Sequence, residues 1–166
     1  MSVTDSNIVD ALQYLNELKG ANLVSVGRAS ALAWFLFAKD NDEYALHLQT
    51  GFRVVANGDI IFASADIFLP SYALESSKEF EYETFDWDMQ GNNRYDERVN
   101  LFDERYSNKL IVYDVFANQF GDLSIQLSEK IKIEVFITMS KEECWRFFKR
   151  NSDRHLIITG EGVVDE

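Results

Sequence analysis

Short runs of alternating apolar and polar residues, separated by turn signals, are the feature that most limits how this chain can fold. Residues 122–128 place apolar side chains at every second position, and residues 130–138 repeat the pattern. A period of two is that of a strand with one buried face. The Asn57-Gly58 dipeptide indicates a two-residue β-hairpin, because both central positions of that turn need positive φ. The chain is therefore expected to fold mainly as an antiparallel sheet.

The same patterns predict the order of the elements. Strands are expected at residues 22–28, 32–38, 43–50, 52–56, 59–64, 110–117, 122–128, 130–138 and 155–159. Helices are expected at residues 7–18, 95–106 and 140–150, the last because Ser140 and Glu143 form a capping-box motif. The predicted fold is α+β: a curved, mostly antiparallel sheet of about eight strands, with barrel-like closure left open, packed with an N-terminal and a C-terminal helix. At 19.2 kDa, residues 1–166 fit a single domain.

Charge and cysteine content narrow the function classes. The chain has 28 acidic against 16 basic residues, a net charge of −12. That balance argues against binding to nucleic acid or to anionic membranes, both of which need clustered Lys and Arg. The longest apolar run, residues 31–38, is far shorter than the roughly 20 residues of a membrane span. Cys144 is the only cysteine, so no intramolecular disulfide can form, and we expect a cytoplasmic location.

Residues 71–105 concentrate the negative charge. They hold ten acidic against four basic residues, half of the excess of the whole chain. Within them, residues 79–88 alternate acidic with aromatic side chains. One interpretation is a bulged edge strand, or two short strands, that buries the aromatics. The other is a docking surface for a basic protein, with aromatic anchors and acidic steering. The candidate partner-binding residues are Glu79, Phe80, Glu81, Tyr82, Glu83, Phe85, Asp86, Trp87 and Asp88.

A polar group is predicted on one sheet face. Alternation places His47 and Gln49 on the same side of a strand, where Arg53 would join them. Such a group could hold an anion or a carboxylate, but a satisfied hydrogen-bond network is the favoured interpretation. His155 is interpreted as a surface or turn residue and Cys144 as inert packing. No metal-ligand spacing and no catalytic motif is found, so neither a metal, a cofactor nor enzymatic activity is expected.

Two segments resemble a known family. One contains Leu46-His-Leu-Gln49 and Arg53, followed by Asp66; the other contains Glu143-Cys-Trp-Arg146. They are similar to an uncharacterised family of small bacterial proteins with a Leu-His-x-Gln…Arg core and a C-terminal Glu-x-Trp-Arg signature. Where that family usually has Cys-Pro-Trp-Arg, this chain has Thr50-Gly-Phe-Arg53. The resemblance implies a bacterial domain without an established activity. It adds a tentative ligand-binding set, which comprises His47, Gln49, Arg53, Asp66, Trp145 and Arg146.

The function expected from these observations is non-enzymatic binding of a basic protein, for example as an immunity-type protein that neutralises a toxin. The alternative is a small-ligand-binding protein or an unrecognised enzyme that uses His47, Gln49, Arg53 and Asp66. A third possibility is a homo-oligomer whose interface buries an apolar sheet face.

Overall fold

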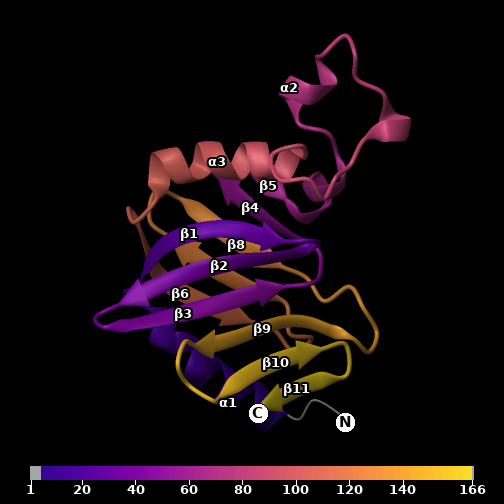
Figure 1. The fold of residues 1–166 in the computed structure, drawn as a ribbon. Coiled ribbons are helices and arrows are strands. Elements are labelled where there is room, and N and C mark those ends of the chain that lie inside the picture. Colours follow the sequence, from indigo (N-terminus) through magenta and orange to yellow (C-terminus); the bar gives the residue numbers. More distant parts are fainter. Residues whose placement is uncertain (1–4, 166) are drawn as a thin grey trace.

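Eleven antiparallel strands form one continuous, open sheet in the computed structural model, which describes residues 5–165 (Figure 1). In chain order the strands are β1 (Asn22–Ala29), β2 (Leu32–Lys39), β3 (Asp42–Leu48), β4 (Phe52–Ala56), β5 (Asp59–Ala63), β6 (Leu110–Ala117), β7 (Leu123–Leu127), β8 (Ile131–Val135), β9 (Glu143–Lys149), β10 (His155–Thr159) and β11 (Gly162–Asp165). The helices are α1 (Asp5–Leu15), α2 (Tyr72–Glu75) and α3 (Arg94–Tyr106), with 3₁₀ turns η1 (Asn16–Leu18), η2 (Ser64–Phe68) and η3 (Tyr82–Thr84). The α+β class and the antiparallel sheet are thereby confirmed.

The sheet folds into two halves that face each other. Its strand order is β11-β10-β9-β3-β2-β1-β6-β7-β8-β4-β5. Only two residue pairs, Asn22 with Ile111 and Leu23 with Leu110, join β1 to β6. At this narrow junction the front half (β1–β3 and β9–β11) turns over the back half (β4–β8), as Figure 1 shows. The phenyl ring of Phe35 on β2 lies 5.8 Å from that of Phe52 on β4, so the two halves share one core.

Each long helix packs against one edge strand and one of the two strands that meet at the junction. α1 packs against β6 and the edge strand β11, whereas α3 packs against β1 and the opposite edge strand β5. The edge strands β11 and β5 do not pair with each other, and each packs against a different helix, α1 or α3. The sheet is therefore open, and the barrel-like closure that the sequence left open is absent.

Local turn chemistry fixes several of the strand boundaries. Asn57 and Gly58 have φ values of 53° and 86°, as the predicted β4–β5 hairpin requires. The alternation of residues 122–128 and 130–138 also yields the paired strands β7 and β8, with Ile125 opposite Ile133 inside the core. The N-terminal helix and the helix near residues 95–106 are likewise confirmed.

The predicted C-terminal helix is wrong. Residues 143–149 form strand β9, which pairs with β3 on one side and β10 on the other. A bulge at Cys144 buries it together with Trp145, and Phe147 follows inward two residues later. The burial of residues 144, 145 and 147 resembles the spacing of buried residues along one face of a helix. The capping box is only a local signal, and strand pairing on both sides together with the β preference of aromatic residues outweighs it.

The region 79–88 is not a strand. Pro70 and Asn93 form an isolated β-bridge, which we call the neck. The chain between these two residues contains α2 and η3 and projects from the body as an arm (Figure 1). The bulged edge strand expected there is therefore wrong. The nine expected strand ranges all become strands, and β9 and β11 are added to them, so the sheet has eleven strands where about eight were expected.

Candidate functional site

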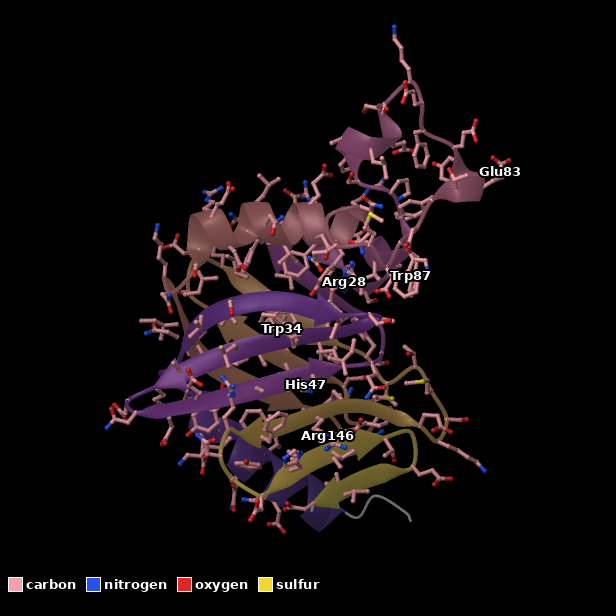
Figure 2. All side chains as sticks on the ribbon, viewed as in Figure 1. Arg28, Trp34, His47, Glu83, Trp87 and Arg146 are labelled. Carbon is pink, nitrogen blue, oxygen red and sulfur yellow. The ribbon has the colours of Figure 1, made fainter. Side chains whose placement is uncertain are left out.

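Three of the six tentative ligand-binding residues lie together on the outer face of the front half. His47 on β3 stands directly opposite Arg146 on β9, and Gln49 follows at the end of β3. Figure 2 shows His47 and Arg146 on adjacent strands, with Trp34 on the next strand. Gln49 and Arg146 are hydrogen-bonded through Glu143, whereas the predicted network of His47, Gln49 and Arg53 does not form as such, because Arg53 lies on the other half of the sheet.

Two further residues complete this group, which we call the sheet-face cluster: His47, Gln49, Glu143, Arg146 and His155. The Glu143 carboxylate accepts hydrogen bonds from Gln49 Nε2 at 2.6 Å and from Arg146 Nε at 2.8 Å. Arg146 Nη1 lies 3.0 Å from His155 Nδ1. Since a guanidinium can only donate, His155 accepts at Nδ1 and carries its proton on Nε2. The bulge at Cys144 is what brings Glu143 and Arg146 to the same face of β9.

The charges of Arg146 and Glu143 offset each other within the sheet-face cluster. Burial lowers the pKa of His47 from its ordinary value of 6.5, and the positive charge of Arg146 lowers it further. The His47 ring makes an edge contact with Phe148, which in turn stacks on His155 at 4.4 Å between centroids. Among the described residues no group of three or more His, Cys, Asp or Glu side chains could hold a metal ion.

A groove of ≈ 430 Å³ lies beside the cluster. Leu36 and Ala45 line it together with Trp34, His47 and Phe148. A Cβ at Gly27 would collide with the Trp34 indole, so the absence of a side chain there lets the indole lie against β1.

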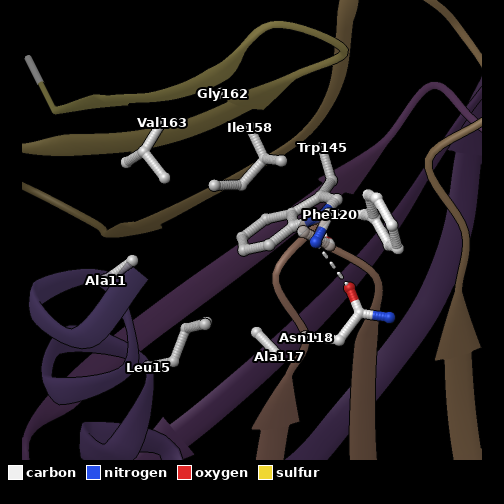
Figure 3. Close-up of a pocket in the computed structure, with 10 residues that line it drawn as sticks. Ala11, Leu15, Ala117, Asn118, Phe120, Trp145, Ile158, Gly162 and Val163 are labelled. Atoms are coloured by element: carbon white, nitrogen blue, oxygen red, sulfur yellow. Dashed lines mark hydrogen bonds between the residues drawn. The ribbon is translucent and has the colours of Figure 1, made fainter. Parts of the chain in front are cut away.

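The other three tentative ligand residues lie elsewhere. Arg53 is on the outer face of the back half, where it pairs with Glu134 at 2.6 Å. Asp66 accepts a hydrogen bond from the Ala63 amide at 2.9 Å and caps η2. Trp145 is buried in the core and donates from Nε1 to the carbonyl of Gly121 (2.8 Å). The space beside Trp145, shown in Figure 3, is ≈ 10 Å³, too small for a ligand.

The acidic segment forms the second candidate site, the arm of residues 71–93. The arm has six acidic residues and one lysine, a net charge of −5. Its neck is closed by hydrogen bonds from the Ser71 amide to the Asn92 carbonyl and from the Arg94 amide to the Leu69 carbonyl, both 2.8 Å. Figure 2 places Glu83 far from the body, whereas Trp87 lies near the neck.

Aromatic side chains give the arm an internal cluster of its own. The Phe80 ring lies 4.9 Å from Tyr82 and 6.0 Å from Phe85. Tyr82 is nevertheless 64% exposed, and its hydroxyl donates to Glu75 at 2.8 Å. Trp87 behaves differently: it packs on Phe68 and reaches the core. Of the nine predicted partner-binding residues, those at positions 79–86 therefore lie on the projecting part, and Trp87 and Asp88 belong to its base.

A buried arginine fastens the base of the arm. Arg28 on β1 forms a two-point ion pair with Asp96 of α3, with both N–O distances 2.8 Å. It also reaches the Asp88 carboxylate at 3.1 Å. The side chains of Arg28 and Asp96 are each only 2% exposed. The hydrogen bonds that Arg28 donates to Asp96 are the main reason that the pKa of Arg28 is raised, so the guanidinium stays charged.

The arm also binds the side chain of Arg94, and an arginine of a partner protein could bind in the same way. The Arg94 guanidinium lies 4.1 Å above the Tyr72 ring and 3.0 Å from the Glu75 carboxylate. Stacking on an aromatic ring together with a carboxylate bridge suits a planar guanidinium better than an ammonium group.

Comparison with known proteins adds no relative. No family model, no curated protein and no solved structure matches this chain. The resemblance to the uncharacterised bacterial family therefore stays a prediction. In the described part of the chain, no helix is long and apolar enough to cross a membrane.

Sequence reasoning missed Glu143 and His155 as members of the sheet-face cluster. Glu143 was interpreted as part of the capping box of a predicted helix. His155 falls opposite Phe148 only because β10 pairs with β9. The apolar run at residues 156–158 was the available signal for a strand, and the strand partner was not readable from it.

Proposed function

We propose that this chain is a protein-binding module that presents the arm of residues 71–93 to a basic protein partner. The observation that carries the proposal is that the arm is fixed to the body at its base but projects from it. Its exposed carboxylates and exposed tyrosine lie where they add little to the stability of the fold. Fixing a backbone costs about 1–2 kcal/mol per residue, so a folded arm that buries little of itself is costly unless it has a use. Neutralisation of a basic toxin by an immunity-type protein would be one case of this function.

Charge and aromatic content define the partner's chemistry. Clustered carboxylates accelerate the encounter with a basic surface, and the effect weakens as salt rises. Exposed aromatic residues are the side chains most often found as binding anchors. The contact of Arg94 with Tyr72 and Glu75 supports an arginine-bearing partner over a lysine-bearing one.

Affinity capture from the native host at low and at high salt tests this proposal. The wild-type chain is compared with a variant in which Glu79, Glu81 and Glu83 become Gln and Tyr82 becomes Ser. The matched control changes the exposed Glu104, Glu142 and Glu161 to Gln, which removes the same amount of charge outside the arm. We expect a basic protein to be retained by the wild type and the control and lost by the arm variant. Recovery of no arm-dependent partner at either salt would contradict the proposal.

A second candidate function is supported by the sheet-face cluster. The convergence of His47, Gln49 and Arg146 beside a groove favours binding of a small, uncharged polar ligand, because Glu143 already pairs with the Arg146 charge. Arg53 and Asp66 take no part in this narrower version of the alternative.

Amide chemical shifts can test this second candidate. The chain is titrated with neutral sugars and nucleosides, and shifts confined to β3, β9 and β10 are expected. They should disappear in the Arg146→Gln variant. A panel that moves no amide in these strands would count against the site.

A further inference from the structure

An exposed apolar patch covers part of the outer face of the back half. On β6, Ile111, Tyr113 and Phe116 point outward and are 48%, 60% and 61% exposed. Phe136, directly after β8, is also exposed. Large apolar side chains on one sheet face, with no helix of the described chain over them, mark an interaction surface in a soluble protein.

The patch is hollowed between its phenylalanines. Phe116 and Phe136 line a groove of ≈ 400 Å³, and Ser124 on β7 lies between β6 and β8 as a small residue in its lining. The Arg53 guanidinium lies 5.3 Å from the centroid of the Phe136 ring. The face therefore has a concave centre beside the protruding side chains of Phe116 and Tyr113.

The charges of this face are balanced. Arg53 and Lys132 both contact Glu134, at 2.6 and 2.9 Å, and Asp122 also lines the groove. Two cations and two anions make the groove neutral, on a chain whose net charge is −12. A basic partner would gain no steering here, whereas a surface that carries both signs can pair with itself.

We propose that this back-half face is the interface of a two-fold symmetric dimer, and its occupant is a second copy of the chain. A two-fold contact places the same patch on both sides, so each Arg53 and Lys132 can face the partner's acidic residues. Five strands about 4.8 Å apart and roughly five residues long give about 400 Å² a side, the size of a weak, concentration-dependent contact. Aromatic residues at the centre with charges around them are the usual composition of such a contact.

Light scattering during size-exclusion chromatography tests the dimer. The mass of the wild type is expected to rise towards twice 19.2 kDa as its concentration is raised to about 100 μM. Tyr113→Ser and Phe116→Ser each remove a central aromatic side chain and should each weaken the dimer roughly tenfold, so the double variant should run as a monomer. Both residues are exposed, and circular dichroism verifies that the variant is folded.

The matched control is Tyr82→Ser in the arm, since Tyr82 is as exposed as Tyr113. This variant should remain dimeric. A wild type that stays at 19.2 kDa at every concentration would overturn the inference, as would a Tyr113/Phe116 double variant that dimerises like the wild type. The inference is independent of the arm's proposed function, since partner capture and self-association are read separately.

Discussion

At the scale of single residues, Arg28 is predicted to contribute strongly to stability through its buried ion pair. Arg28→Ala leaves the Asp96 carboxylate buried without its partner, and breaking a buried pair in this way costs about 3–5 kcal/mol. Urea unfolding measures the change. The control is Arg150→Ala, because Arg150 pairs with Glu43 at the exposed surface, where an ion pair contributes at most about 1 kcal/mol. Equal losses in the two variants would contradict the role assigned to Arg28.

His47 predicts a pH dependence of stability. Its pKa in the folded protein is below 6.5, so the unfolded chain binds the proton more readily. The stability that neutral His47 contributes is present above pH 6.5 and is lost as the pH falls towards the folded pKa. The groups that face it are Arg146, Glu143 and His155.

The measurement is the free energy of unfolding between about pH 7.5 and pH 5. His47→Gln, which keeps a neutral polar side chain, should make the loss on acidification smaller than in the wild type. An unchanged slope would show that another group is responsible. His155→Gln serves as the comparison, because His155 lies in the same cluster and contacts Arg146 directly.

The candidate site was only partly predictable from its residues. His47 and Gln49 share a face because strand alternation requires it, and this was readable from sequence. Arg53 follows four residues later but lies on the other half, because the chain crosses from β3 to β4 at Thr50 and Gly51, and β4 pairs with β8. Consecutive strands usually pair, and the exception depends on contacts with a strand about eighty residues away.

At the scale of elements, alternation and turn chemistry predicted the strands well, and local helix signals predicted β9 badly. The capping box at Ser140 is a local preference, but strands pair with residues 143–149 on both sides and bury Cys144, Trp145 and Phe147 in the core. The arm was unpredictable for a related reason. Its acidic-aromatic alternation has the period of a strand, yet no strand of the described sheet pairs with it.

The attachment of the arm to α3 gives a prediction at this scale. The Glu97 carboxylate accepts hydrogen bonds from the Tyr72 and Ala73 amides, at 2.9 and 3.2 Å, and so caps the start of α2. Glu97→Ala should accelerate hydrogen exchange of these two amides by roughly tenfold, about 1.4 kcal/mol of local opening. Glu104→Ala is the control, an exposed change on the same helix. Equal exchange in both variants would show that Glu97 does not hold the arm.

At the scale of the whole molecule, three surfaces of different chemistry lie on separate parts of one body. The arm is acidic, the front face carries the sheet-face cluster, and the back face is aromatic. Their separation follows from the folded-over sheet, since each half exposes one face and the arm leaves from the chain between β5 and α3. Binding at one surface therefore need not block another.

The shared core predicts that both halves unfold together. Phe35 is fully buried on β2, and its ring lies 5.8 Å from Phe52 and 6.5 Å from Phe62 across the core. Phe35→Ala should lower the free energy of unfolding by about 3–5 kcal/mol through the lost contacts and the cavity. Hydrogen exchange of β2 and β3 amides follows the front half, and that of β7 and β8 amides follows the back half. Because Phe35 joins the halves, both probes should report the same loss, and Phe35→Leu should lose less. A variant whose front half melts while β7 and β8 keep their protection would show two independently stable halves, against the single cooperative unit that the common core implies.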